Sequence, residues 1–318
     1  MTTLGEIGES AVLARIFPRL PQAAAQLLGP GDDAAVLAAP DGRYVVTTDM
    51  MIHGPDFRLA WSSPADLGWK AAASNLSDVA AMGAVPTALV VALAAPAETT
   101  VEFLEAFADG LREGCEALAP GCGVVGGDLS VSATLTIAVT AFGDLEGRPP
   151  VLRSGAQVGD VVAVSGVLGS AAEGLRLLFN EGVVDGIPDA HAAAQVAREH
   201  PVPIAAQLRP RPPIADGRAA AIAGATAMLD LSDGLAIDAR RLAAASGVAL
   251  DLRGLTREEI TGGEDHSLLA TFPRGVPLPG GFRVIGEVVA GEGVLVDGVP
   301  FADRGGWDPY DGWNGGAG

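Results

Sequence analysis

The sequence is poor in basic residues and above all in lysine, because Lys70 is the only lysine among 318 residues. Twenty Lys and Arg stand against 39 Asp and Glu, which gives a formal net charge of −19 at pH 7. A surface of this sign repels the backbones of DNA and RNA, so we expect no nucleic-acid partner. The single lysine also excludes a Walker A loop, because "GWK" at 68–70 lacks the Gly-Lys-Ser/Thr order. It argues against a protein kinase as well, because little of the lysine set of those enzymes is present.

Cysteine and long apolar runs are also scarce. Only Cys115 and Cys122 occur, and their spacing matches no disulfide framework or zinc motif. Gly, Pro or charged residues interrupt each apolar stretch well before membrane-spanning length, and "MTTLGEIGES" at the N-terminus lacks the layout of a signal peptide. A hydrophobic content of 49% nevertheless argues against disorder. We therefore expect a globular, cytoplasmic protein with no membrane partner.

The chain is long enough for two domains. Strand and helix patterns alternate in both halves without the strict rhythm of a doubly wound sheet, which predicts an α/β or α+β fold. Gly, Pro and Arg concentrate in "EGRPPVLRSGAQVGD" from residue 146, so we place the boundary between domains 1–147 and 148–318. Residues 63–84 have helical spacing with Ser63 as cap and Pro64 in the first turn, and residues 282–298 are typical of a closing strand pair.

One apparent nucleotide motif is excluded by its context. "GCGVVG" at 121–126 fits G-x-G-x-x-G, but that fingerprint needs a strand before it and a helix after it. Here a helical pattern precedes it and a strand pattern follows. The histidines give weaker indications: His191 and His200 are typical of surface residues, whereas His53 and His266 lie near aspartate motifs.

Five short aspartate motifs carry the chemistry: "GDD" (31–33), "TTD" (47–49), "NLSD" (75–78), "GGD" (126–128) and "DLSD" (230–233). Each places Asp at the end of a strand or turn beside small residues. Alone, each is typical of turns or helix caps, and we expect Ser232 or Asp233 to cap the helix that follows. Together they form a set of hard oxygen ligands suited to Mg²⁺ ions that bridge a polyphosphate.

The ordered set of motifs resembles the thiamine-monophosphate kinase family, whose superfamily also contains aminoimidazole-ribonucleotide synthetase. The resemblance runs from about residue 5 to 310 and rests on "GDDAAVL", "TTDMMIHGPDF", "DLGWKAAASNLSDVAAMGAVP", "VVGGD", "VLRSGAQVGD", "LDLSDGLAID" and "TGGEDHSLL". It implies Mg²⁺- and ATP-dependent phosphorylation of thiamine monophosphate to thiamine diphosphate. It also implies a homodimer whose N-terminal domains pair through their sheets into a barrel, each followed by an α/β C-terminal domain.

Site residues follow from the same resemblance. The implied metal ligands are Asp32, Thr47, Thr48, Asp49, Asp78, Asp128, Asp230 and Asp233, of which Asp49, Asp78, Asp128 and Asp233 are the implied catalytic residues. The implied ATP contacts are Gly127, Asp128, Arg153 and Ser232, and the implied substrate contacts are Asp56, Glu264 and Trp307. The sequence departs from the family pattern in three places, since Asp56 stands where histidine is usual, Ser267 stands where glutamate is common, and the usual "GGDTT" reads "GGDLS" at 126–130.

The residues favour direct in-line transfer between phosphates. The attacking oxygen belongs to a phosphate whose second pKa is roughly 6, so it needs no strong general base. Metal ions would instead reduce the repulsion between the two polyanions. Two alternatives remain open: another ATP-dependent synthetase of the same superfamily, and a non-catalytic protein that binds divalent cations or nucleotides.

Overall fold

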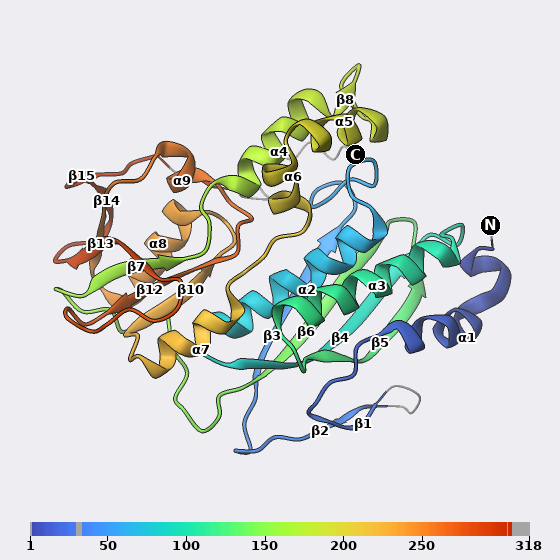
Figure 1. The fold of residues 1–318 in the computed structure, drawn as a ribbon, viewed down its shortest axis with the longest axis horizontal. Coiled ribbons are helices and arrows are strands. Elements are labelled where there is room, and N and C mark those ends of the chain that lie inside the picture. The colour runs from blue at the N-terminus through green and yellow to red at the C-terminus, as the bar shows by residue number, and fades with distance from the viewer. Residues whose placement is uncertain (1, 30–33, 304, 307–318) are drawn as a thin grey trace.

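The computed structural model describes residues 2–29, 34–303 and 305–306 of the chain, and two β-sheets organise it (Figure 1). The first sheet has the strand order β3 (Val45–Ile52), β6 (Thr136–Asp144), β4 (Val85–Ala95), β5 (Gly123–Val131). The second has the order β10 (Ala227–Leu231), β12 (Ser267–Phe272), β7 (Val161–Ser165), β13 (Arg283–Val289), β11 (Ala249–Leu252), β14 (Gly293–Val296), β15 (Val299–Pro300). The boundary predicted at 147/148 falls on the connection from β6 to β7 and stays a prediction.

Two long helices cover one face of the first sheet, α2 (Pro64–Ala81) and α3 (Val101–Leu118) (Figure 1). The prediction for α2 is confirmed, including its start, because the Ser63 side chain accepts a hydrogen bond from the Asp66 N–H. The two helices approach closely at Gly68, where a Cβ atom would lie 2.1 Å from the Phe107 carbonyl oxygen. This close contact fixes the position of the α2 face that looks toward the second sheet.

The opposite face of the first sheet has no helix over it among the described residues. The segment that holds β1 (Gln26–Leu28) and β2 (Val36–Leu37) packs against Val90 and Phe142, while Val46 and Met50 stay 56% and 58% exposed. Helix α1 (Leu4–Ile16) and the short turn η1 (Phe17–Arg19) lie beside α3 and its edge of the sheet. One face of this sheet is therefore helical core, and much of the other remains open.

Three strands of the second sheet are buried on both faces. Every residue of β10, β11 and β12 is buried, as continuous apolar strands predict. Helix α8 (Leu235–Ser246) packs on one face, and α7 (Ile214–Ile222) with the end of α2 packs on the other. Strands β13 and β14 exist as predicted, but they are not neighbours, because β11 lies between them and pairs with both.

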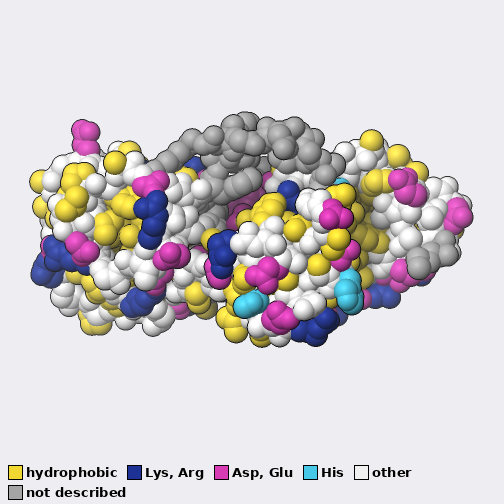
Figure 2. Space-filling model, turned by 90° about the horizontal axis from the view of Figure 1, so that it is seen from above, with side chains coloured by type: hydrophobic (Ala, Val, Ile, Leu, Met, Phe, Trp, Pro, Cys, Tyr) yellow, Lys and Arg dark blue, Asp and Glu magenta, His cyan; other side chains and the backbone are white. Residues whose placement is uncertain are grey.

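A third group of helices stands above the two sheets in Figure 1: α4 (Ser170–Glu181), α5 (Ala190–Glu199) and α6 (Pro201–Leu208). These helices, with the small hairpin of β8 (Val183–Val184) and β9 (Ile187–Pro188), surround a core that includes Trp61 and Leu178. Helix α9 (Arg257–Thr261) lies beside α4 and α8. Acidic side chains are spread across the face seen in Figure 2, with basic ones among them. Among the described residues, no helix combines the length and apolar character needed to cross a bilayer.

Candidate active site

A cavity of about 730 Å³ lies between α2, the end of β3, the turn after β10, the loop before β12 and helix α4. Its lining carries six carboxylates, which come from both halves of the chain: Asp49, Asp56, Asp78, Asp230, Asp233 and Glu264. Arg153 and Ser232, which the sequence predicts as ATP contacts, line it too. We call this cavity the cleft.

The first half of the chain contributes Asp49 and Asp78 to the cleft. Thr47 and Asp49 point from β3 toward α2, and the Thr47 hydroxyl donates to Asp78 across 2.8 Å. Burial raises the pKa of Asp78 to about 7, and the nearby charges of Asp230 and Asp49 add to this effect. Asp49 keeps open surface toward the cleft, but the protein packed around it raises its pKa as well. Acidic groups from both halves of the chain thus repel one another within the cleft.

The "DLSDG" turn supplies Asp230, Ser232 and Asp233 from the second half. Helix α8 begins at Leu235, after Gly234, and neither Ser232 nor Asp233 caps it, so the predicted cap is wrong. The free N–H groups of Asp233 and Gly234 both donate to Asp238, at 3.1 Å each, which places the capping carboxylate inside the first turn. Asp230 is buried at the end of β10.

Asp233 and Asp238 share one cationic partner. Arg241 lies 2.6 Å from Asp233 and 2.7 Å from Asp238. Burial nevertheless raises the pKa of Asp238 to about 7, with Asp230 and Asp233 as further causes. Nothing in the sequence pattern distinguishes Asp238 or Arg241 from their neighbours, because both lie within a regular helix.

The "GGEDH" loop runs beside the "DLSDG" turn and is joined to it through the backbone. Glu264 N–H donates to the Ser232 carbonyl at 2.8 Å, and His266 N–H donates to the Leu231 carbonyl at 3.0 Å. Glu264 and His266 both have positive φ angles, 69° and 52°, which are unusual for residues with side chains. Such backbone strain is concentrated at functional sites.

Asp265, between these two residues, faces the other way. Its carboxylate accepts hydrogen bonds from the Gly169 and Ala171 N–H groups, at 2.6 and 2.9 Å. It therefore caps the start of α4, where Gly169 has a left-handed conformation and no side chain to do so. The two acidic residues of the loop therefore have different roles. Glu264 faces the cleft, and Asp265 fixes the loop to α4.

Buried polar groups of α2 complete this wall. His266 is 4% exposed and lies with Nε2 3.2 Å from the Ser74 hydroxyl and Nδ1 3.5 Å from Asp230. Burial opposes protonation of His266, but Asp230 and Glu264 outweigh it and raise the pKa. The Asn75 side-chain NH₂ group donates to the Ala71 carbonyl. The Oδ1 atom of Asn75 is buried and has no hydrogen-bond partner among the described residues.

Aromatic rings and arginine form the end of the cleft beside α4. The Arg58 guanidinium lies 4.8 Å from the Trp61 ring centre and 4.7 Å from that of Phe179, and the two rings contact each other edge to face with centres 5.0 Å apart. The Trp61 indole donates to the Gly182 carbonyl at 2.8 Å, which connects the loop before α2 to the end of α4. Asp56 closes the preceding turn by accepting from the Ile52 N–H at 2.7 Å, and burial raises its pKa.

The predicted metal ligands do not all meet in the cleft. Across the first sheet, Asp49 is in register with Val139, Val91 and Gly127, which places Gly127 on the helix-covered face. Asp128 is one residue further on, in register with Ala92 and the exposed Met50, and therefore lies on the open face. Thr48 lies there as well, within 3.2 Å of Thr140. Asp32 and Trp307 lie outside the described residues.

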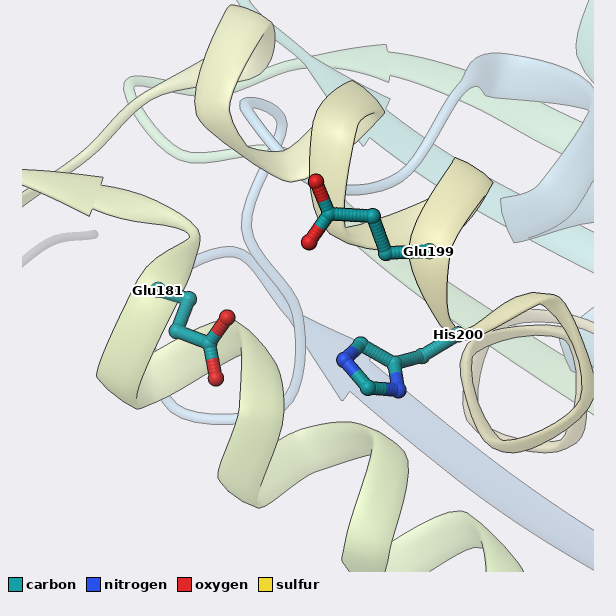
Figure 3. Close-up of side chains that lie close together, drawn as sticks. All are labelled: Glu181, Glu199 and His200. Atoms are coloured by element: carbon teal, nitrogen blue, oxygen red, sulfur yellow. The ribbon is translucent and has the colours of Figure 1, made fainter.

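The donors of the cleft fit Mg²⁺ in kind, since they are carboxylate, hydroxyl and amide oxygens. The carboxylates do not converge closely enough for three to hold one ion. Among the described residues, only Glu181, Glu199 and His200 bring three such ligand atoms within 4.8 Å of one another (Figure 3). These three do not line the cleft, and both glutamates are exposed. A cation in the cleft would therefore share one or two carboxylates with other oxygen ligands, as Mg²⁺ usually does with phosphates and water.

Comparison with known proteins agrees with this architecture. Residues 31–145 match the family model "AIR synthase related protein, N-terminal domain". The thiamine-monophosphate kinase of Mycobacterium tuberculosis is 45% identical over 97% of this chain and 93% of its own length. The crystal structure of thiamine monophosphate kinase from Aquifex aeolicus is 33% identical, covers 83% of this chain and 90% of that chain, and has a TM-score of 0.71.

A further solved structure, "AaThiL complexed with AMPPCP and TMP", is 34% identical, covers 86% of this chain and 90% of that chain, and has a TM-score of 0.72. Identity at this level over nearly the whole chain goes beyond a shared fold. The chain belongs to the thiamine-monophosphate kinase family.

Proposed function

We propose that the cleft binds ATP and thiamine monophosphate together and transfers the γ-phosphoryl group of ATP to the substrate phosphate, giving ADP and thiamine diphosphate. This ATP-dependent phosphorylation is the activity of the family to which the chain belongs. A relative of the same fold was solved with AMPPCP, an ATP analogue, and TMP. One observation of this chain carries the proposal furthest: carboxylates from both halves, Asp49 and Asp78 on one side and Asp230 and Asp233 on the other, line one cleft.

We assign Mg²⁺ to the same carboxylates. Asp49, Asp78, Asp230 and Asp233, with the Thr47 hydroxyl, would hold the ions, and Asp32 is assigned with them from the family pattern. Bound there, Mg²⁺ would neutralise phosphate charge and polarise the phosphoryl oxygens. The raised pKa of Asp78 supports this assignment, because a buried carboxylate without a cation resists ionisation.

The chain's own residues bind and orient the two substrates. Arg153 and Ser232 line the cleft and are assigned to ATP, where a guanidinium suits paired contacts to phosphate oxygens. Glu264 and Asp56 place negative charge where a cationic thiazolium ring would lie, and Trp307 is assigned to the same substrate from the family pattern. The substrate phosphate is largely ionised near neutral pH, with a second pKa of roughly 6, so the site needs no general base.

We also propose that the protein acts as a homodimer whose first sheets pair into a barrel. The open face of the first sheet supports this, because Val46 and Met50, two apolar residues of β3, are more than half exposed there. Asp128 and Thr48 lie on the same face. Within one chain Asp128 points away from the cleft. Its role in metal and ATP binding would therefore be at the cleft of the partner subunit, which it would reach across the paired sheets.

A turnover assay with ATP, Mg²⁺ and thiamine monophosphate tests the activity. We expect thiamine diphosphate and ADP in equal amounts, and neither product in quantity when the acceptor is left out. ATP hydrolysis with no phosphorylated thiamine would favour another synthetase of the superfamily, and binding without turnover would favour the non-catalytic alternative.

A further inference from the structure

The only lysine of the chain lies inside the cleft. Lys70 is on the face of α2 that also carries Ser74, Asn75 and Asp78, and it is 7% exposed. In a chain with about twice as many acidic as basic residues, a buried ammonium group at this position is unusual.

Two neighbours hold the ammonium group in place. Lys70 Nζ lies 2.5 Å from a carboxylate oxygen of Glu264. The Gln207 amide, oriented so that both its groups are satisfied, accepts from Lys70 Nζ at 3.2 Å and donates to the Ala171 carbonyl at 3.0 Å. Three segments thus converge on one nitrogen: helix α2, the strained loop before β12, and helix α6.

The hydrogen-bond capacity of Lys70 is not exhausted by these contacts. An ammonium group has three N–H donors, and within the described residues Glu264 and Gln207 account for two. Because Lys70 lines the cleft, the remaining donor is available to a ligand. The partner of a buried ammonium donor must be an acceptor, and a negatively charged oxygen suits it best.

Its position favours the phosphate of the acceptor substrate over that of the nucleotide. Lys70 is paired with Glu264 and lines the cleft together with Asp56, and these are the two carboxylates assigned to the substrate side. Asp78 follows eight residues later on the same helix face, which is about 12 Å along the axis. A substrate phosphate beside α2 would therefore lie between the ammonium group and metal ions held by the carboxylates further along the helix.

We propose that Lys70 is a phosphate-binding residue of the cleft, held by Glu264 and Gln207 so that its third N–H meets an oxygen of the thiamine monophosphate phosphate. The proposal rests on the function proposed above and adds a residue to it. Glu264 then has two tasks, since one carboxylate oxygen orients Lys70 and the other faces the cleft.

Calorimetric binding to the full-length protein separates the sources of the phosphate oxygen. The probes are thiamine monophosphate, thiamine and AMPPCP, each with Mg²⁺, against wild type, Lys70→Met and Lys70→Arg. Loss of one charge-assisted hydrogen bond should weaken thiamine monophosphate binding to Lys70→Met by roughly 10- to 100-fold. Thiamine, which has no phosphate, and AMPPCP should bind as in wild type, and Lys70→Arg should recover part of the loss. Arg274→Met, which removes an exposed cation paired with Glu287, is the matched control and should change nothing.

An equal loss of affinity for thiamine and thiamine monophosphate would overturn the proposal and leave Lys70 only as the ion-pair partner of Glu264. A loss confined to AMPPCP would also overturn it, because it would move the contact to the nucleotide. If Lys70→Met fails to fold, the wild-type protein still decides: lysine labelled with ¹³C at Cε gives a single side-chain NMR signal. Thiamine monophosphate should shift that signal, and an unshifted signal at saturation would refute the contact. Absence of turnover in wild type would refute the proposed function while leaving these binding comparisons valid.

Discussion

Asp128 lies on the opposite face of the four-stranded sheet from Asp49, although both come from aspartate motifs of the same kind. Asp49 is in register across the sheet with Gly127, and Asp128, one residue further along β5, is in register with Met50. Because side chains alternate along a strand, one residue of register decides whether a carboxylate faces the cleft or the open side. If both carboxylates serve one reaction, they come from two different subunits.

Heterodimers test this arrangement directly. Asp78→Asn and Asp128→Asn homodimers should each lose turnover. A purified heterodimer with one subunit of each kind should recover about half of wild-type activity, because one of its two composite sites then has both carboxylates.

The matched control pairs Asp78→Asn with Asp49→Asn. Both residues face the cleft of their own chain, so each site of that heterodimer lacks one carboxylate and activity should stay lost. Inactive Asp78→Asn/Asp128→Asn heterodimers would place Asp128 outside the partner's site.

Asp78→Asn should stabilise the metal-free protein at pH 8 while abolishing turnover. The pKa of Asp78 is raised to about 7 in the folded state. Between the unfolded value near 3.8 and about 7 the folded state binds the additional proton, so stability falls as pH rises through this window. Removing the charge should therefore add about 1–2 kcal/mol to the free energy of unfolding at pH 8 and little at pH 4.

Urea unfolding at both pH values, with and without Mg²⁺, measures this effect. Mg²⁺ should stabilise the wild type more than the variant. Asp185→Asn, in the exposed turn between β8 and β9, is the control and should leave both stability and turnover unchanged. A variant less stable than wild type at pH 8 without metal would contradict the repulsion between these carboxylates.

Asp265→Ala should reduce stability and also weaken substrate binding. It removes the two hydrogen bonds that cap α4, at a cost of about 1–2 kcal/mol, and frees the loop that positions Glu264. Asp189→Ala removes the cap of α5, where Asp189 accepts from the Ala192 N–H, and should cost a similar amount. Only Asp265→Ala should raise KM for thiamine monophosphate, and equal KM values in the two variants would show that the loop is held by other contacts.

Gly68→Ala should destabilise the protein by about 3 kcal/mol, because its Cβ would lie 2.1 Å from the Phe107 carbonyl oxygen and separate α2 from α3. Gly114→Ala, on α3 of the same helix pair, places its Cβ 3.2 Å from that of Ala72. There the gain in helix propensity offsets the tighter contact, so the change should stay within about 1 kcal/mol. Thermal unfolding of both variants checks the difference, and similar melting temperatures would contradict the close approach at Gly68.

Local signals in the sequence identified the elements that hold the site. The Ser63 cap and the Pro64 start of α2 follow from side-chain chemistry within one helical turn. The apolar runs of β10 and β12 require burial on both faces whatever their neighbours are. The expectation that each aspartate lies where a strand or turn ends is wrong for three of them, because Asp49 and Asp128 lie within β3 and β5 and Asp78 lies in the last turn of α2.

Features that depend on pairing between distant segments were not predictable. In β5, Val125 has no partner in β4, since Leu89 pairs with Val124 and Val90 with Gly126. This irregularity shifts the alternation of side chains and moves Asp128 to the open face. Similarly, Asp265 caps α4 from a loop that lies 96 residues away from Gly169 in the sequence. The insertion of β11 between β13 and β14 depends on a crossover that no short-range pattern records.

The pairing of Lys70 with Glu264 has a consequence for the rest of the molecular surface. Every other basic side chain apart from four histidines is an arginine, and guanidinium groups keep their proton at any physiological pH. Apart from the terminal amine, the protein offers amine-reactive reagents a single nucleophile, and that one is enclosed by its cleft. Acylation at Lys70, read separately from the terminal amine by peptide mass spectrometry, should thus report on the occupancy of the cleft, because bound ligand shields the ε-amine.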